Sequence, residues 1–249
     1  MSACRLDKYL SLSGQRTRSE AARLIRSGCV QVNGAVVKDP AAKVGAGAEV
    51  LLSGQSVRDS TYQYYLVYKP AGVLTAARDS RAQTVMDLLP PSLVRRKVLP
   101  VGRLDKDTTG LLLLTNDGVL AHSLIDPGRH VWKRYIARVE GRLTPQDEDA
   151  FASGMVLSDF TAKPAQMRIL QARKAESLAQ VDLREGKYHQ VKRMFAACGH
   201  PVLTLHRSVF GPVSLPEDAQ PGFFRELTAN EVAALKQAVT SSNKEEQHA

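Results

Sequence analysis

A run of four consecutive leucines at residues 111–114 constrains this chain more than any other feature. A short apolar run without alternation is typical of a strand that is buried on both faces, because neither row of side chains is polar. Residues 116–118, Asn-Asp-Gly, then predict a turn, and Leu120 and Leu124 recur at helical spacing. The sequence therefore predicts a central strand that is covered on both sides and is followed by a helix.

The segment directly before this strand, GRLDKDTTG at residues 102–110, is charged and polar. Asp105 stands in it between Arg103 and Lys106. A loop held by a buried strand is a common place for a reacting group, because the strand fixes the position and the loop leaves the side chain accessible. An aspartate in a turn can equally bond only to its own backbone. The loop residues by themselves leave both interpretations open.

The charge of the chain points to a polyanionic partner. Its 34 Lys and Arg residues outnumber its 25 Asp and Glu residues, which gives a formal net charge of +9. Such an excess favours nucleic acid as the partner, although basic surfaces also serve solubility alone.

The sequence predicts no metal and no cofactor. Cys4, Cys29 and Cys198 lie far apart without a C-x-x-C spacing, and the chain has no P-loop or dinucleotide-binding glycine pattern. It opens without the apolar segment of a secretion signal, and no apolar stretch approaches membrane-spanning length. We therefore expect a cytoplasmic protein without contact to a membrane.

A polar, turn-rich stretch divides the chain in two. We expect a first domain at residues 1–53, a linker at 54–61, a second domain at 62–240 and a disordered, charged tail at 241–249.

The first domain has the pattern of a helix pair plus a small sheet. Thr17 and Glu20 form a capping-box pattern at the start of the second helix. A strand then alternates up to Asn33-Gly34, a strong hairpin signal, and a further strand is expected at residues 49–52.

The two predicted helices of the first domain carry basic residues. Residues 1–57 hold eight basic against four acidic side chains, so acids do not neutralise this charge. A solvated helix face is one interpretation, and an RNA-binding face is the other. The candidate RNA-binding residues are Arg5, Lys8, Arg16, Arg18, Arg23 and Arg26.

The second domain opens with the strand pattern YQYYLVYKP, at the end of which Lys69 projects. A structural turn is the simpler interpretation of this lysine, and a place near a site is the alternative.

The segment KYHQVKRMFAACG has the pattern of an amphipathic helix. Its apolar residues recur at helical spacing, so one face is buried and His189, Lys192 and Arg193 project from the rest. These three side chains can therefore reach a site.

Two resemblances give these patterns a meaning. The arrangement RLDKYL…TRSEAARLIRSGCVQVNG…VKDPAAKV over residues 3–52 resembles the S-four type RNA-binding domain. GRLDKDTTGLLLLTNDG resembles the signature of pseudouridine synthases of the small-subunit rRNA type, in which G-R-L-D-x-x-T-x-G-L holds the essential aspartate. KRYIARVEG and LREGKYHQVKRMFAACGHPVLTLHRSVFG resemble the second and third segments of that family, in the same order.

The resemblance implies a role for each candidate. Asp105 would be the reacting carboxylate, as nucleophile or base, and Tyr135 would lie against the uracil and take part in proton transfer. Lys192 would be the basic partner of the aspartate, with Arg193 as the second choice. Arg103 would fill the gap left by the flipped nucleotide or hold its phosphate, and Lys69 and His189 would support substrate binding. An ordinary strand tyrosine and a solvated loop arginine are the alternatives for Tyr135 and Arg103.

The resemblance also implies an α+β fold. A helix-pair-plus-sheet RNA-binding module would precede a synthase domain with a largely antiparallel central sheet and a catalytic cleft. The implied substrate is a uridine of ribosomal RNA, free or in a small-subunit assembly intermediate, and the segments after residue 187 favour 16S rRNA. We expect a monomer with no obligate protein partner. A large-subunit enzyme, a non-catalytic RNA-binding assembly factor and, last, a hydrolase remain as alternatives.

Overall fold

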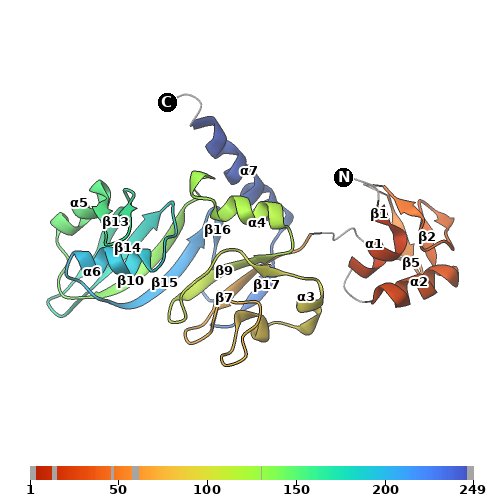
Figure 1. The fold of residues 1–249 in the computed structure, drawn as a ribbon, viewed down its shortest axis with the longest axis horizontal. Helices are drawn as coiled ribbons and strands as arrows, with labels where there is room; N and C mark the ends of the chain where they lie inside the picture. Colours follow the sequence, from red (N-terminus) through yellow and green to blue (C-terminus); the bar gives the residue numbers. More distant parts are fainter. Residues whose placement is uncertain (1–3, 13–15, 46–47, 58–61, 130, 246–249) are drawn as a thin grey trace. The chain divides into compact units, whose positions relative to one another are not determined.

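The computed structural model describes residues 4–12, 16–45, 48–57, 62–129 and 131–245 (Figure 1). The chain forms two compact units, Met1–Gln63 with Pro90–Val98, and Tyr64–Leu89 with Leu99–Ala249. The division after Gln63 lies close to the predicted end of the linker. Residues 90–98 differ from the expectation, because the sequence predicts them as part of the second domain.

The first unit is a helix pair packed on a small antiparallel sheet of strand order β3-β2-β5-β6, as predicted. Leu6, Tyr9, Ile25, Val30 and Val50 belong to one buried cluster that joins the helices to the sheet. The elements are β1 (Cys4–Arg5), α1 (Leu6–Leu12), α2 (Arg18–Arg26), β2 (Val30–Val32), β3 (Ala35–Val36), β4 (Lys43–Val44), β5 (Val50–Leu52) and β6 (Gln55–Ser56).

Two local signals in this unit are confirmed. The backbone N–H of Thr17 donates to the Glu20 carboxylate at 2.6 Å, and the N–H of Glu20 donates to the Thr17 hydroxyl at 3.2 Å. This capping box satisfies two N–H groups that the start of α2 would leave unpaired. Between β2 and β3, Asn33 and Gly34 have φ values of 49° and 80°, the positive values that a tight hairpin turn requires.

The predicted linker is wrong at its start. Ser53 and Gly54 have φ values of 49° and 76°, so they form a second tight hairpin. Gln55 and Ser56 then pair with β5 as strand β6. These polar residues lie at the exposed edge of the sheet, which is why their composition resembles a linker. Residues 58–61 of the predicted linker lie outside the described residues.

The second unit is built on one large sheet of strand order β13-β14-β10-β15-β9-β7-β17, with β8 added to β9 and β16 added to β15. Its ladders are antiparallel except that of β9 with β15, which confirms the largely antiparallel sheet. The strands are β7 (Tyr64–Lys69), β8 (Leu99–Pro100), β9 (Thr109–Thr115), β10 (Lys133–Glu140), β13 (Gln166–Ala172), β14 (Glu176–Leu183), β15 (Val202–Phe210), β16 (Val213–Ser214) and β17 (Phe224–Glu226). A separate hairpin pairs β11 (Met155–Val156) with β12 (Thr161–Ala162).

Helices cover parts of this sheet. The longer ones are α4 (Gly118–Ile125), α5 (Pro145–Ser153), α6 (Gln190–Ala197) and α7 (Ala229–Glu245), with short turns α3 (Pro91–Arg95), η1 (Val85–Leu88) and η2 (Pro127–Arg129). In Figure 1, α5 and α6 lie together near β13 and β14, and α4 and α7 lie together near β16. None of the helices in the described part of the chain is long and apolar enough to cross a bilayer.

The disorder predicted from residue 241 is wrong for residues 241–245, because α7 continues through Glu245. The sequence from residue 229 onward contains neither glycine nor proline, so nothing in it ends the helix. Residues 246–249 lie outside the described residues.

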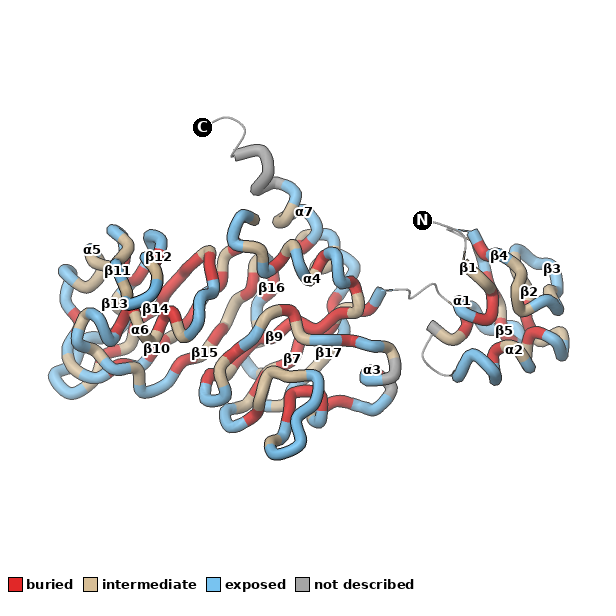
Figure 2. Tube along the Cα trace, viewed as in Figure 1, coloured by how far each residue is buried: buried red, intermediate tan, exposed pale blue. Residues whose placement is uncertain are grey.

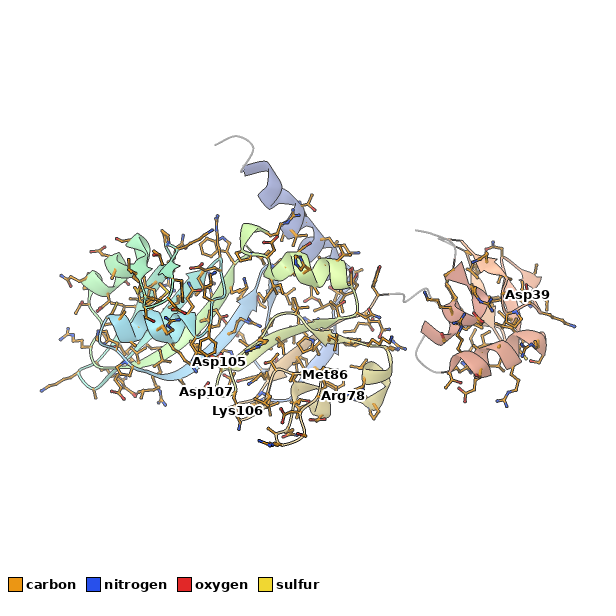
Figure 3. The ribbon with its side chains drawn as sticks, viewed as in Figure 1. Asp39, Arg78, Met86, Asp105, Lys106 and Asp107 are labelled. Atoms are coloured by element: carbon orange, nitrogen blue, oxygen red, sulfur yellow. The ribbon has the colours of Figure 1, made fainter. Side chains whose placement is uncertain are left out.

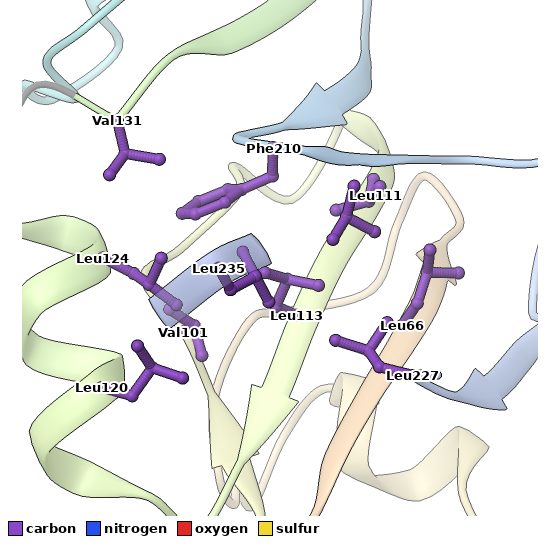
Figure 4. Packing of buried hydrophobic residues seen from close by; sticks show 11 residues of the cluster. Leu66, Val101, Leu111, Leu113, Leu120, Leu124, Val131, Phe210, Leu227 and Leu235 are labelled. Atoms are coloured by element: carbon purple, nitrogen blue, oxygen red, sulfur yellow. The ribbon is translucent and has the colours of Figure 1, made fainter. Parts of the chain in front are cut away.

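The leucine run forms the buried strand that the sequence predicts. Leu111 and Leu113 face a cluster that includes Leu120, Leu124 and Leu235 from α4 and α7 (Figure 4). Leu112 and Leu114 point to the opposite face and are also buried. Figure 2 shows β9 as a buried segment while the turns around it are exposed. The strand is therefore a rigid support for the loop that precedes it.

Gly110, at the start of β9, allows β9 and β15 to meet. A Cβ atom at Gly110 would lie 2.2 Å from the carbonyl oxygen of Arg207 and 2.7 Å from its backbone nitrogen. The glycine also has a φ of +108°, which side chains rarely adopt. The parallel ladder between the two strands pairs only His206 with Thr109 and Arg207 with Gly110. Gly110 therefore belongs to one of the two residue pairs that join β9 to β15.

We predict that Gly110→Ala destabilises the protein by at least about 2 kcal/mol, because strain and a backbone clash add together. Urea unfolding monitored by circular dichroism measures this change. Gly118→Ala is the matched control, since Gly118 has open space around its Cβ position and lies in helix α4. Equal stability of the Gly110→Ala variant and the wild type would contradict the prediction.

Candidate active site

The loop that carries Asp105 is tied down on both sides of the aspartate. The hydroxyl of Thr75 donates to the carbonyl oxygen of Leu104 at 2.8 Å and accepts the N–H of Leu104 at 3.2 Å. The N–H of Gly72 donates to the carbonyl oxygen of Lys106 at 2.8 Å. Figure 3 shows Asp105, Lys106 and Asp107 together on this loop. These bonds fix the backbone while the side chain of Asp105 stays 27% exposed.

Lys69 also binds this loop, through hydrogen bonds to its backbone. Its ammonium donates to the carbonyl oxygens of Pro70 at 2.9 Å, Lys106 at 3.1 Å and Thr108 at 2.7 Å, which uses all three of its N–H groups. The residue is fully buried, and burial lowers the pKa of its ammonium to about 8. This differs from the predicted role in substrate binding, because an enclosed ammonium cannot contact a substrate. Lys69 instead shapes the loop.

His189 and Lys192 approach Asp105 from the start of α6. The Nζ atom of Lys192 lies 3.3 Å from Oδ2 of Asp105 and 2.6 Å from Oδ1 of Asp107. The Nε2 atom of His189 lies 3.4 Å from Oδ1 of Asp105. The hydrogen bond from Lys192 lowers the pKa of the Asp107 carboxyl. One ammonium thus serves two carboxylates, and an imidazole flanks the first of them.

A pocket joins Asp105 and His189 to Tyr135 of β10. Asp105 and His189 line this pocket together with Arg103 and Tyr135. Further parts of its wall are Leu104, Thr108, Leu183, Gly186, Lys187, Gln190, Val191 and Leu205. Tyr135 is buried and belongs to the same wall as Asp105. The pocket is therefore lined by a carboxylate, a tyrosine and apolar side chains.

Arg193 lies away from this pocket. Its guanidinium donates to the hydroxyl of Ser158 at 2.8 Å and pairs with the carboxylate of Asp159. It also stacks over the ring of Phe160 at 4.8 Å from the centroid. These contacts tie α6 to the β11–β12 hairpin, which differs from the predicted contact of Arg193 with a substrate or with Asp105.

Sequence reasoning missed two side chains at the site. Tyr188 is 67% exposed and stacks on the His189 ring, with centroids 3.9 Å apart and planes inclined by 17°. Arg207 of β15 is buried and donates to the hydroxyl of Tyr135 at 3.4 Å. A signal for Arg207 was present, because it stands two residues after the buried Leu205 and so occupies the same face of its strand.

The six candidate RNA-binding residues of the first unit are all at least partly exposed: Arg5, Lys8, Arg16, Arg18, Arg23 and Arg26. Two of them also stabilise the fold. Arg5 and Arg18 lie 2.8 and 3.3 Å from the carboxylate of Asp7, and the bonds from Arg5 help to lower the pKa of Asp7 to about 2. Their side chains are nevertheless 43% and 57% exposed.

Comparison with known proteins identifies the family. The model of the RNA pseudouridylate synthase family matches residues 63–197, and the model of the S4 domain matches residues 4–50. The chain therefore belongs to the RNA pseudouridylate synthase family, a family of isomerases, and carries an N-terminal S4 domain.

Several relatives match over almost their whole length. The chain is 40% identical over 235 residues to YtzG, an uncharacterized RNA pseudouridine synthase of Bacillus subtilis (strain 168), covering 94% of this chain and 98% of the relative. It is 36% identical to the ribosomal small subunit pseudouridine synthase A of Yersinia pestis, covering 93% and 97%. A crystal structure of a pseudouridylate synthase superposes with a TM-score of 0.65 at 33% identity, covering 93% of this chain and 99% of the other.

We predict that Lys69→Met destabilises the protein by about 1 to 3 kcal/mol, because three carbonyl oxygens lose their donor. The difference should also depend on pH. The folded pKa of about 8 lies below the ordinary 10.5, so unfolding takes up a proton between these two values. The free energy of unfolding of the wild type, relative to the variant, should therefore increase as pH rises through this window.

Urea unfolding of wild type and Lys69→Met at pH 7 and pH 10 tests this, because the folded pKa of about 8 lies between these two pH values. Lys106→Met on the exposed part of the same loop is the control and should give a small, pH-independent difference. A pH-independent difference for Lys69→Met would contradict the account of a buried, titrating ammonium.

Proposed function

We propose that this protein isomerises a uridine of 16S ribosomal RNA to pseudouridine, with Asp105 as the reacting carboxylate. The observation that carries the proposal is the shared pocket of Asp105 and Tyr135, with Lys192 at 3.3 Å from the carboxylate. The 16S target is supported by the segments YHQVKRMFAA and LHR, which resemble the small-subunit branch of the family. We further propose that it acts as a cytoplasmic monomer.

The reaction changes connectivity without changing composition. The bond between C1′ of the ribose and N1 of uracil breaks, the base turns in the pocket, and C1′ bonds to C5, which then gives its proton to N1 by way of acid–base groups or solvent. No electron or group enters or leaves. The reaction needs an ionised carboxylate near C1′, either to attack that carbon or to start an elimination, and a site that keeps water away from the loose base.

Lys192, with His189 beside it, stabilises the negative charge on the Asp105 carboxylate that this step requires. A carboxylate beneath a flipped base loses water, which favours its protonated form, and a cation at 3.3 Å opposes that effect. A single ammonium does this as a point charge without the fork geometry of an arginine. Its second contact, with Asp107, keeps Lys192 at the loop when no substrate is bound.

Tyr135 and Arg103 receive the extruded nucleotide. A base taken out of its helix loses stacking, which an aromatic ring can replace. Tyr135 supplies that ring, and its hydroxyl supplies a group for proton transfer at C5. Arg103 is exposed at the mouth of the same pocket, where a guanidinium can meet a phosphate or occupy the vacated space.

The first unit supplies affinity. The six candidate basic residues, all at least partly exposed, suit contacts to an RNA backbone, which place the substrate without choosing the reacting base. The choice of base then rests with the second unit and with the structure of the RNA.

We predict that Asp105→Asn abolishes pseudouridine formation while leaving RNA binding intact. Purified wild type and variant are incubated, without added cofactor, with 16S rRNA, with small-subunit assembly intermediates and with 23S rRNA, and pseudouridine is mapped on each. Asp107→Asn is the matched control, because it also contacts Lys192 but its side chain is 74% exposed and lies outside the pocket wall. This control should keep most of its activity.

Each result has a distinct meaning. Product from both wild type and Asp105→Asn would remove Asp105 as the reacting group. Product only on 23S rRNA would move the target to the large subunit. Binding without product on any RNA would favour a non-catalytic assembly factor.

We predict that Lys192→Met lowers the single-turnover rate roughly 100-fold, or by about 2.7 kcal/mol in the activation barrier, because the carboxylate loses its charged partner. Lys192→Arg should recover part of this loss. Arg193→Met is the neighbouring control and should mainly affect stability, since Arg193 bonds to Ser158 and Asp159. A larger rate loss in Arg193→Met than in Lys192→Met would reverse the two assignments.

A further inference from the structure

Arg207 is a buried cation whose charge has no acidic partner in the part of the chain that the structure describes. Its exposure is 2%, and no carboxylate of the described residues lies within ion-pair distance of its guanidinium. Its Nη2 atom is buried and has no hydrogen-bond partner among those residues either. Burying an uncompensated charge costs several kcal/mol. A residue that carries this cost beside a reaction pocket calls for a role beyond packing.

The guanidinium connects the two strands that hold the reacting groups. Its Nε atom donates to the carbonyl oxygen of Leu111 on β9 at 2.8 Å. Its Nη1 atom donates to the hydroxyl of Tyr135 on β10 at 3.4 Å. β9 directly follows the Asp105 loop, so one side chain links the support of the aspartate to the hydroxyl of the tyrosine.

The backbone leaves Arg207 little freedom. In the ladders, Arg207 stands opposite Tyr135 on one side and opposite Gly110 on the other. Cross-strand partners project to the same face of a sheet, so the guanidinium and the phenol ring share one face. The contact at Gly110 fixes the backbone of Arg207 at the point where its side chain departs. The pairing of β15 with β9 and β10 therefore fixes the direction in which the Arg207 side chain leaves the backbone.

A second buried cation lies close by. Lys133 donates to the carbonyl oxygen of Val131 at 3.1 Å, and its Nζ atom lies 5.4 Å from the Phe210 ring centroid. The guanidinium of Arg207 lies 5.1 Å from the same centroid. Burial, and next the charge of Arg207, lowers the pKa of Lys133 to about 8. Glu185 acts on Lys133 in the opposite direction, so Lys133 has a carboxylate in its surroundings, whereas the N–H that reaches the Tyr135 hydroxyl comes from Arg207.

We propose that Arg207 is a positioning residue that acts on the reaction through the hydroxyl of Tyr135. A phenol oxygen has one proton and two lone pairs. The N–H from Arg207 occupies a lone pair, so the proton of the hydroxyl points away from the guanidinium. A bond donated by a cation also stabilises negative charge on the oxygen, which suits a group that exchanges a proton with C5 of uracil. At 3.4 Å this bond is long, and such bonds in reaction sites commonly tighten when the substrate binds.

This inference rests on the proposed function, and a double-mutant cycle separates the two. Single-turnover rates at saturating RNA are measured for wild type, Arg207→Met, Tyr135→Phe and the double variant, and RNA affinity is measured for each. Tyr135→Phe removes only the hydroxyl. We expect Arg207→Met to lower the rate about 10- to 100-fold at unchanged RNA affinity, which is less than the full effect of roughly 100- to 10,000-fold of one acid–base group. In the Tyr135→Phe background the same change should have no further effect.

The dependence of the rate on pH gives a second readout. The part of the profile that disappears in Tyr135→Phe should also change in Arg207→Met, because both substitutions act on the same hydroxyl. Arg207→Lys replaces Arg207→Met in the cycle if the latter does not fold, since it keeps the charge but cannot bridge Leu111 and Tyr135. Arg138→Met, which breaks an exposed ion pair between β10 and Glu176 of β14, is the control and should leave rate and profile unchanged.

The outcomes are distinct. An equal rate loss from Arg207→Met in both backgrounds would show that Arg207 only supports the fold and would overturn the inference, while the proposed function stands. An unchanged pH profile would overturn it in the same way. Absence of product from the wild type on every RNA would overturn the proposed function and the inference together.

Discussion

The close approach of β9 and β15 at Gly110 is the contact on which the candidate active site depends. A side chain there would push the two strands apart, because its Cβ would overlap the backbone of Arg207. Helix α6 comes directly before β15 in the chain, so the position of β15 decides where α6 lies. Lys192 and His189 can meet Asp105 only because this ladder closes. Because Gly110 has no side chain, the start of α6 can reach the carboxylate of Asp105, which lies far away in the sequence.

Two groups of basic side chains near the pocket differ in what they contact. Lys192, together with the imidazole of His189, faces the carboxylate of Asp105 and stays partly exposed. Lys69, Lys133 and Arg207 are buried and direct their N–H groups to backbone carbonyls or to the hydroxyl of Tyr135. The first group acts on charge in the pocket, and the second holds the loop and strands that form it. Net positive charge in this protein is therefore partly an internal, structural property.

Local patterns in the sequence predicted the elements that local forces decide. The leucine run, the capping box of Thr17 and the turn at Asn33-Gly34 depend on neighbouring residues only, and the structure has all three. The partners of Lys69 and Arg193 depend on segments far away in the chain, so their predicted contacts with substrate differ from the structure. Strand β6 was not predicted for the same reason, because its polar residues form a strand only by pairing with β5. Asp105, His189 and Lys192 lie near one another in the structure, and the expectation that Lys192 is the partner of Asp105 came from the resemblance, since periodicity carries no long-range information.

The last strand of the large sheet has a consequence for synthesis of the protein. β17 pairs with β7, the first strand of that sheet, although almost the whole second unit separates them along the chain. Pairings between such distant segments form late, because a long loop must close first. While the ribosome is still translating the middle of the gene, one edge of β7 therefore has no strand beside it, and unpaired edges invite association with other chains. Nascent chains stalled before residue 226 should for this reason be prone to aggregate. A chaperone that shields β7 would bind during the period before β17 is synthesised.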